Sequence, residues 1–574
     1  MEELMGRTGS RGKGMGVLLL KGAGRPDPAP EAAQDPCAEC GRLRDAADRC
    51  LAEFKEMEQN AFRQGGAGAA EIFQAYQAIL EDPYFLEEML ERLRRERLRA
   101  EWVAFDACRS LARCMADSGD GYLAGRAADF RMVGGALLRA LAGENSVTEA
   151  PAGQDIVLAA DDLSPADTIS IDKSRLKGIV IQQGTTSSHT VILARTLGIP
   201  AVVGVDGLLE RCTPGALVLV DGDAGRAVLS PDAETLTRFT GALRADAAHR
   251  ARMEASARRP AATRDGRPVA VRANTGDCES LRALEMDACD GIGLFRTEFL
   301  FLGRSCAPTE EEQFAVYREA VTRAGGKEVI IRTLDVGGDK QASYMGLPTE
   351  ANPFLGLRGI RVCLERPELF RTQLRAILRA SLFGPLKIMF PMVTSCPELA
   401  CGRRAVESAA AGLRAEGVAV PDRVAVGVMV ETPASVLLCD RLAAEADFFS
   451  IGTNDLTQYI MAADRMNQHV AALYDAAHPA VLRAVAAVAR AGRAAGVPVG
   501  ICGEAAADEA LAPLWAAMGV GELSMAAGRI GAVKAALRAS DARALESSLP
   551  GLLACRDGRE VRARLKTRLE EVTL

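Results

Sequence analysis

The chain lacks several features that mark particular classes of protein. It contains no run of about 20 apolar residues, the length that a membrane span requires. The apolar stretch at residues 16–20 is too short for the core of a secretory signal peptide, and the residues before it include acidic ones. Basic blocks are absent and the net charge is -7, so nucleic-acid wrapping is not expected. We expect a cytoplasmic chain whose partners are small anions or proteins.

Paired cysteine motifs are also scarce, although the chain has fifteen cysteines. Cys37 and Cys40 form one CxxC motif, but no second pair follows and the motif opens a helical pattern. A metal or redox role for this pair is therefore disfavoured. The remaining cysteines are scattered through apolar segments, which is typical of buried thiols in a reducing compartment.

The length predicts more than one domain, because 574 residues exceed the roughly 250–300 at which a single core stops growing. Residues 31–145 show apolar side chains at helical spacing and predict an antiparallel bundle. Residues 146–230 alternate short β-branched runs with helices, which predicts an α/β domain. A linker helix is expected at 231–262. The fold class is therefore multidomain α/β.

Strands and helices alternate regularly from residue 263 to residue 574. Eight such strands in roughly 300 residues are typical of a (β/α)8 barrel. The candidate strands are residues 269–272, 291–295, 329–332, 386–390, 424–430, 448–451, 497–502 and 522–525.

Polar residues stand where these candidate strands end. The carboxyl ends of barrel strands meet at one rim, which carries the active site in barrel enzymes. The residues at these ends are Asn274, Arg296, Arg332, Asp335, Pro391, Glu431, Asn454, Asp455, Cys502, Glu504 and Ser524. Arginines bind oxyanions with planar donors, and carboxylates hold a hard divalent cation. The rim is expected to bind a phosphorylated acid with Mg2+; each residue taken alone is equally compatible with a solvated turn.

One of the four histidines, His189, stands where a hydroxyl-rich turn meets an amphipathic run at residues 183–195. The expected position is a helix N-terminus, where unpaired N–H groups and the helix dipole stabilise a phosphate by about 0.3–2 kcal/mol. The alternative is that His189 only caps or packs at the start of the helix. A phospho-acid pocket on one domain and such a histidine on another suggest phosphoryl transfer between them.

Four long segments carry a resemblance to a known family. They are residues 293–301 (GLFRTEFLF), 331–340 (IRTLDVGGDK), 352–361 (NPFLGLRGIR) and 447–459 (DFFSIGTNDLTQY). These segments resemble Enzyme I, the phosphoenolpyruvate-protein phosphotransferase family of bacterial sugar phosphotransferase systems. The resemblance extends over nearly the whole chain from about residue 72. It implies a phosphohistidine α/β domain with an inserted helical bundle, followed by a (β/α)8 barrel that binds phosphoenolpyruvate and forms a homodimer.

The resemblance also implies a role for each matching residue. His189 resembles the histidine that is phosphorylated on Nε2, and Thr168 the residue that orients its ring. Glu431 and Asp455 resemble Mg2+ ligands, and Cys502 the acid that protonates the enolate. The residues that resemble substrate ligands are Arg296, Arg332, Arg358, Asn454 and Arg465, with Lys340 in a matching charged loop. For Cys502 alone, a small buried residue is the simpler interpretation.

A carrier protein, HPr, is the implied acceptor of the phosphate, and the helical bundle is its implied docking site. Tyr76, Ile79, Leu80 and Arg126 occupy places that resemble the docking face. Apolar residues at helical spacing are more often core than surface, so a core position is the alternative for the first three. Delivery of the phosphate requires His189 to swing between the barrel and the carrier, with the linker helix as the pivot.

Three departures from the family pattern qualify these expectations. The family loop reads Gly-Gly-x-Thr-Ser-His, whereas this chain has Thr185 in place of a glycine, and a β-branched residue does not readily adopt positive φ. Either a slightly different loop conformation or slower transfer is expected. The first strand of residues 1–30 is unsettled because the usual opening is missing, and residues 28–50 match poorly, which leaves the carrier preference open.

Two other interpretations compete with phosphotransferase activity. A pyruvate phosphate dikinase or phosphoenolpyruvate synthase shares the histidine domain and the barrel but needs a nucleotide-binding domain, and no glycine-rich ATP loop is visible. A non-catalytic relay protein would be expected to lose a metal carboxylate or an arginine. None of these residues is missing.

Overall fold

The computed structural model forms two compact units, Met1–Ala247 and Ala248–Leu574. None of the helices in the described part of the chain has the length and apolar character that a membrane crossing needs. The residues that the structure describes are 1–21, 28–65, 67–116, 121–143, 153–161, 175–182, 191, 194, 198–302, 304, 306–337, 342–348, 350–465, 467 and 469–573.

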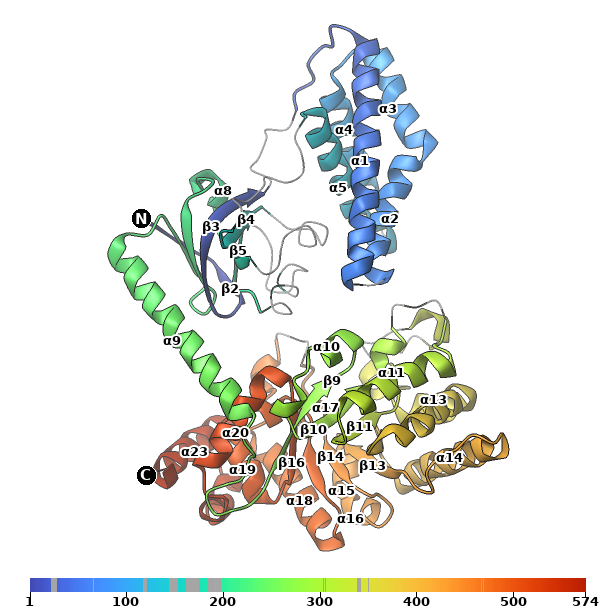
Figure 1. The fold of residues 1–574 in the computed structure, drawn as a ribbon, viewed down its shortest axis with the longest axis vertical. Coiled ribbons are helices and arrows are strands. Elements are labelled where there is room, and N and C mark those ends of the chain that lie inside the picture. Colours follow the sequence, from blue (N-terminus) through green and yellow to red (C-terminus); the bar gives the residue numbers. More distant parts are fainter. Residues whose placement is uncertain are drawn as a thin grey trace. The chain divides into compact units, whose positions relative to one another are not determined.

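An eight-stranded mixed sheet organises the first unit (Figure 1). The strand order is β1-β8-β7-β3-β4-β5-β6-β2, in which β3 to β6 run parallel and the others pair antiparallel. The strands are β1 (Glu2–Met5), β2 (Arg7–Ser10), β3 (Lys13–Lys21), β4 (Ile156–Ala160), β5 (Leu176–Ile181), β6 (Ala201–Val203), β7 (Leu217–Asp221) and β8 (Arg226–Leu229). The short helix α8 (Leu208–Arg211) follows β6, and α9 (Ala233–Ala257) follows the sheet.

A helical bundle is inserted between β3 and β4, as the sequence predicts. Asp82 ends one helix and starts the next, because its side chain accepts the Tyr84 N–H at 2.9 Å and Pro83 occupies the first helical position. Each helix turns an apolar face toward a shared core that includes Leu43, Phe73 and Met89. The helices are α1 (Pro36–Gly65), α2 (Ala67–Glu81), α3 (Pro83–Glu96), α4 (Ala100–Ala116) and α5 (Gly121–Leu141).

The second unit is a closed barrel of eight parallel strands, which confirms the predicted (β/α)8 fold. The strands are β9 (Ala270–Thr275), β10 (Gly291–Arg296), β11 (Glu328–Arg332), β12 (Leu386–Phe390), β13 (Ala425–Val430), β14 (Phe449–Ile451), β15 (Val499–Ile501) and β16 (Glu522–Met525). The helices are α10 (Cys278–Ala283), α11 (Glu310–Arg323), α12 (Ile360–Glu365), α13 (Pro367–Ala380), α14 (Cys396–Ala415), α15 (Pro433–Leu437), α16 (Cys439–Leu442), α17 (Thr453–Met461), α18 (Pro479–Ala495), α19 (Leu511–Met518), α20 (Ile530–Ala539), α21 (Ala542–Glu546), α22 (Leu549–Leu553) and α23 (Gly558–Thr573).

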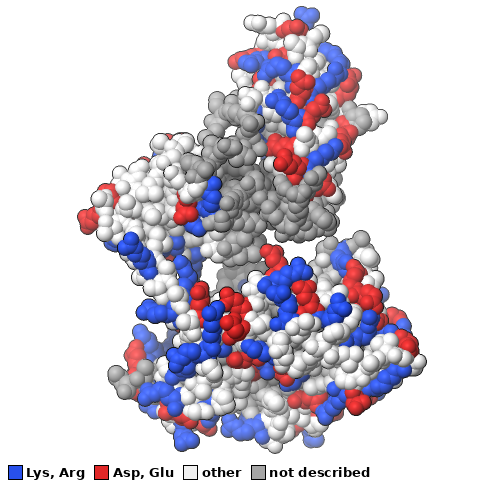
Figure 2. All heavy atoms as spheres, viewed as in Figure 1, with Lys and Arg blue, Asp and Glu red and all other residues white. Residues whose placement is uncertain are grey.

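Buried packing determines the shape of the barrel interior. Its strands are almost entirely buried because the surrounding helices cover the outer face and side chains fill the inside. At Gly427 an added Cβ would lie 2.5 Å from the Phe448 ring, so only glycine fits that layer. On the face of the molecule drawn in Figure 2, basic and acidic side chains are interspersed, which agrees with the absence of basic blocks in the sequence.

Candidate active site at the barrel mouth

The carboxyl ends of the barrel strands surround a pocket of about 510 Å³. Every described barrel residue that the sequence analysis assigned to substrate, metal or proton lies on its wall. The lining comprises Leu294, Arg296, Glu298, Arg332, Asp335, Arg358, Met429, Glu431, Gly452, Asn454, Asp455, Arg465, Tyr474, Cys502, Gly503 and Glu504. Residues that the sequence analysis placed at the ends of strands far apart in the chain thus line one cavity.

Two of its four arginines are buried and held by carboxylates. Arg358 is 1% exposed; its Nε lies 2.9 Å from Asp335 Oδ1 and its Nη2 lies 2.9 Å from Asp455 Oδ2. Arg332 pairs with Asp335 at 3.1 Å and with Glu298 at 2.5 Å. This network fixes the orientation of both guanidinium groups before any ligand binds, because Asp335 and Asp455 each hold two donors in place and Glu298 holds a further one.

The other two arginines present open donors. The side chains of Arg296 and Arg465 form no hydrogen bond or ion pair with the described residues, although both line the pocket. The Nε atom of Arg332 is buried and likewise has no partner in the described part of the chain. The buried Arg332 Nε is costly to leave without a partner, so a cavity that gathers it with the Arg296 and Arg465 side chains is suited to an anion with several oxygens.

Glu431 and Asp455 bring two carboxylates to the wall of the pocket. Burial, together with the charges of Asp455 and Asp335, raises the pKa of Glu431 well above its usual range. The Met392 N–H donates to Glu431 Oε1 at 2.6 Å, and Met392 itself has a φ of 58°, an unusual conformation for a residue with a side chain. The backbone at the end of β12 is thus bent to orient this carboxylate.

These carboxylates fit a divalent cation. In the described part of the chain no three His, Cys, Asp or Glu side chains group as a complete protein cage would. Mg2+ does not require such a cage, since it is usually held by one or two carboxylates while substrate oxygens and water complete its shell. A cation beside Glu431 would also offset the burial that disfavours the ionised form of this carboxyl.

Asn454 is positioned by hydrogen bonds on both sides of its amide. It lies in the first turn of α17, where its Oδ1 accepts the Glu504 N–H at 2.8 Å and its Nδ2 donates to Glu504 Oε1 at 3.3 Å. Its carbonyl oxygen accepts the Tyr474 hydroxyl at 3.1 Å. The side chain is therefore locked at the rim, beside Asp455.

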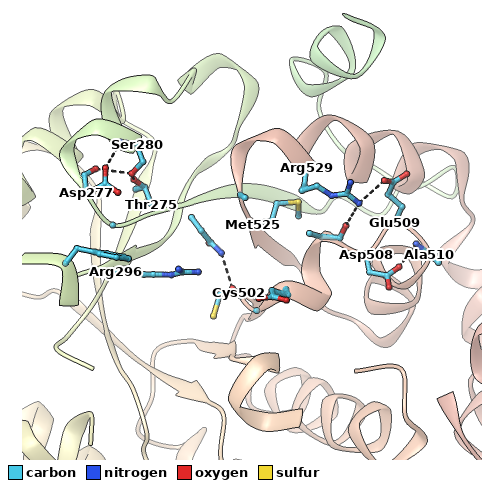
Figure 3. Close-up of a pocket in the computed structure, with 17 residues that line it drawn as sticks. Thr275, Asp277, Ser280, Arg296, Cys502, Asp508, Glu509, Ala510, Met525 and Arg529 are labelled. Carbon is cyan, nitrogen blue, oxygen red and sulfur yellow. Dashed lines mark hydrogen bonds and ion pairs between the residues drawn. The ribbon is translucent and has the colours of Figure 1, made fainter. Parts of the chain in front are cut away.

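Cys502 follows β15 and points into the barrel. Its residue is 3% exposed, its thiol donates to the Ile451 carbonyl at 3.7 Å, and burial raises its pKa to about 11. A neutral thiol at ordinary pH is suited to donating a proton, not to attacking a substrate. A second cavity of about 980 Å³ adjoins the pocket, and Cys502 and Arg296 lie on the boundary between the two (Figure 3).

Comparison with known proteins places this pocket in a family. Models of phosphoenolpyruvate-utilising enzymes match the chain in three parts: the N-terminal part at residues 5–126, the mobile domain at 152–225 and the phosphoenolpyruvate-binding domain at 250–542. The phosphoenolpyruvate-protein phosphotransferase of Geobacillus stearothermophilus is 40% identical over 501 residues, 87% of each chain. The chain belongs to this family.

Other relatives carry the same name. The phosphoenolpyruvate-protein phosphotransferase of Priestia megaterium is 39% identical over 524 residues, which is 91% of each chain. A solved NMR structure of an Enzyme I protein covers 42% of this chain and 98% of its own, with 29% identity and a TM-score of 0.37. The two phosphotransferase relatives, each matched over 87% or more of both chains, confirm the family resemblance that the sequence motifs indicate.

Some of the expected site residues lie outside the described part of the chain. These are His189, Thr168, Lys340 and Thr185, and the side chain of Arg126. Of the residues expected to face the carrier, Tyr76 and Leu80 are 3% and 7% exposed and pack in the bundle core, while Ile79 is half-buried against it. The core alternative therefore describes Tyr76 and Leu80, because their side chains have no surface left to offer a partner.

Sequence reasoning passed over one residue that helps to build the pocket. Glu298 is 1% exposed and holds Arg332, and in the sequence it stands only as one residue of the 293–301 segment. The available signal was an acidic residue among apolar ones, directly after a strand end, where a buried charge needs a partner. Its pairing with an arginine on the next strand depends on register and is not visible in the sequence.

Proposed function

We propose that this phosphotransferase transfers the phosphoryl group of phosphoenolpyruvate to its own His189 and then to a histidine of an HPr-type carrier, releasing pyruvate. The observation that carries the proposal is the barrel-mouth pocket, which combines four arginines, two metal-type carboxylates and one thiol. Such a pocket suits a small acid with a phosphate at one end and a carbon to be protonated at the other.

Each group has a task in the proposed reaction. Arg296 and Arg465 bind the substrate oxygens, and Arg332 adds its Nε, which has no partner among the residues that the structure describes. Nε2 of His189 attacks phosphorus; a P–N bond forms as the bond from phosphorus to the enol oxygen breaks. The enolate then takes the Cys502 proton at its terminal carbon, which gives pyruvate and a thiolate. Positioning and charge stabilisation supply most of the rate enhancement in such transfers.

We propose Mg2+ as the cation, held by Glu431 and Asp455. When bound, it neutralises charge on the phosphate and on the enolate oxygen. Asp455 is shared with Arg358, whose Nη2 lies 2.9 Å away, so this guanidinium holds the carboxylate in place for its ligand role. Asn454 presents its locked amide to the substrate beside the metal ligands.

Replacement of Gly452 by alanine should weaken Mg2+ binding. A Cβ at this position would lie 2.8 Å from Glu431 Oε2, so the carboxylate must move. Disturbing a metal ligand in this way typically costs about 10- to 100-fold in affinity. Titration calorimetry with Mg2+ checks the prediction. Gly551→Ala is the matched control, because nothing lies within 4 Å of its added Cβ; equal affinities in both variants would contradict the assignment.

The domain roles follow from this proposal. Residues 1–30 and 146–230 form the phosphohistidine domain, 31–145 the carrier-binding bundle, 231–262 the linker and 263–574 the phosphoenolpyruvate-binding barrel. We propose that the barrel also forms a homodimer, which sedimentation of the full chain would test, and that the chain works in the cytoplasm, where phosphoenolpyruvate is made.

The decisive experiment uses labelled substrate. The purified chain is incubated with phosphoenolpyruvate carrying labelled phosphorus and with Mg2+, and the label is mapped. An acid-labile label on His189 that an HPr protein removes supports the proposal. Labelling that requires ATP would favour the dikinase alternative, and absence of any label would favour a non-catalytic relay.

A further inference from the structure

A third cavity lies at the amino ends of the barrel strands, remote from the mouth. It measures about 420 Å³ and is lined by Arg272, Glu328, Lys387 and Glu522, among others. Arg272 pairs with Glu522 at 3.2 Å, and Lys387 with Glu328 at 2.8 Å. The side chains of Glu522 and Lys387 remain 19% and 25% exposed, so solvent reaches this cavity.

Ser450 links this cavity to Cys502. Ser450 lies on β14, lines the cavity and is 3% exposed. Its side chain also lies beside the Cys502 thiol, where it lowers the pKa of that thiol. Apolar side chains pack against that thiol, namely Leu294, Ile330, Met389, Met429 and Phe448. The Ser450 hydroxyl thus places a polar group between the cavity and the thiol.

Two glycines leave room for Glu522 inside the barrel. Gly500 pairs with Ser450 in the sheet, and a Cβ there would lie 3.2 Å from the Glu522 Cβ. A Cβ on Gly293 would lie 2.9 Å from Glu522 Oε1. Residues 500 and 502 point to the same face because strand side chains alternate. The Glu522 carboxyl therefore lies against bare backbone, on the interior face that also carries Cys502.

We propose that Ser450 and Glu522 return the proton to Cys502 through the barrel interior. The inference rests on the proposed role of Cys502 as the acid in phosphotransfer. Protonation of the enolate breaks the S–H bond and forms a C–H bond, leaving a thiolate. The Ser450 hydroxyl gives its proton to sulfur and takes one from a cavity water. The Glu522 carboxylic acid resupplies that water, and solvent at the cavity reprotonates the carboxylate.

The chemistry of the two ends of this route supports the direction of transfer. Burial raises the pKa of Glu522 to about 7; the positive charges of Arg272 and Lys387 oppose this rise and Glu328 adds to it. Arg493 also lines the cavity. Burial raises the pKa of Cys502 to about 11, so its thiolate is a strong enough base to take a proton from the relay. Since a water molecule occupies about 30 Å³, the polar cavity is roomy enough for several.

The route also answers a problem of the proposed reaction. Phosphoryl transfer to a histidine brought in by another domain requires a mouth from which water is excluded. A thiolate formed there has no proton source on that side until the mouth reopens. A proton supplied from the amino ends of the barrel strands converts the Cys502 thiolate back to the thiol while the mouth is still closed to water.

Ser450→Ala is the first test, made with the full chain, phosphoenolpyruvate, Mg2+ and an HPr protein. The first turnover uses the proton already on Cys502, so a burst of one pyruvate per site should form at the wild-type rate. Later turnovers should slow at least tenfold, with KM unchanged. Ser450→Thr, which keeps the hydroxyl, should restore the wild-type rate of the later turnovers. Unchanged steady turnover, or equal slowing of the first and later turnovers, would overturn the relay.

Glu522→Gln gives a second test that does not depend on Ser450. The acid form of Glu522 donates, so wild-type steady turnover should fall as pH rises through about 7. The Glu522→Gln variant should turn over slowly at all pH values, without a decrease in steady turnover near pH 7. Glu328→Gln, in the same cavity, is the matched control, and its steady turnover should still decrease as pH rises. A fall near pH 7 that persists in Glu522→Gln refutes the relay, whereas no label on wild-type His189 refutes the proposed function itself.

Discussion

Phosphate capture from phosphoenolpyruvate should drop to background, by about 10³-fold or more, when His189 is replaced by alanine. The imidazole is the proposed nucleophile and the first acceptor, so its loss removes the P–N bond on which the transfer depends. Labelled phosphoenolpyruvate and Mg2+, followed by acid and base treatment of the labelled chain, provide the measurement.

His249→Ala is the matched control for this variant. His249 is an exposed residue of α9 and takes no part in the proposed chemistry. Its replacement should leave labelling at the wild-type level. Retention of the label in His189→Ala, or its loss in His249→Ala, would place the phosphate on a different residue and reject the assignment.

Replacement of Arg358 by leucine should lower the free energy of unfolding of the barrel by about 3–5 kcal/mol. Arg358 is 1% exposed and neutralises Asp335 and Asp455 at 2.9 Å each. Without it, buried carboxylates lose a charged partner, which costs more than any surface pair contributes. Denaturant unfolding of the full chain, followed by a probe of the barrel tryptophan Trp515, measures the change.

Arg371→Leu provides the comparison for this loss. Arg371 pairs with Glu368 on the surface of α13, where the two side chains are 60% and 79% exposed. Its removal should change the stability by no more than about 0.5 kcal/mol. If the double variant Arg358→Leu with Asp455→Asn regains stability, the unpaired carboxylate causes the loss in Arg358→Leu. If Arg358→Leu alone is as stable as Arg371→Leu, the prediction is wrong.

The barrel and its pocket were predictable because two simple rules apply to them. β-branched runs at regular spacing predict the eight strands, and all eight are present as β9–β16. Parallel strands of a barrel end at one rim, so inspecting the residues at the carboxyl end of each strand identifies Arg332, Glu431 and Cys502 without any knowledge of contacts. The chemistry of these residue types then indicates the class of ligand, a phosphorylated acid bound with a divalent cation.

The N-terminal strands could not be predicted from the same signals. Glycines interrupt residues 1–21, and glycine disfavours strands, yet three strands form there. The structure supplies the reason: a Cβ on Gly14 would lie 1.7 Å from the Lys177 carbonyl oxygen, and one on Gly16 would lie 2.7 Å from that of Asp155. Close approach to a neighbouring backbone demands glycine at these positions, and that approach is a tertiary property.

Roles that depend on how neighbouring strands pair could not be predicted from the sequence either. Ser450 is an ordinary small residue in an apolar strand, and its contact with Cys502 arises only when β14 and β15 pair. The same limit applies to Tyr76 and Leu80, since helical spacing alone does not tell which apolar face meets the bundle core and which meets a partner.

The bundle interrupts a single crossover, between the adjacent parallel strands β3 and β4. All five of its helices are therefore one uninterrupted stretch of chain, whose two ends leave and rejoin neighbouring positions of the sheet. Grafting the corresponding stretch from a relative would thus require only two junctions. The bundle and the barrel can consequently diverge independently in this architecture, each under its own selection.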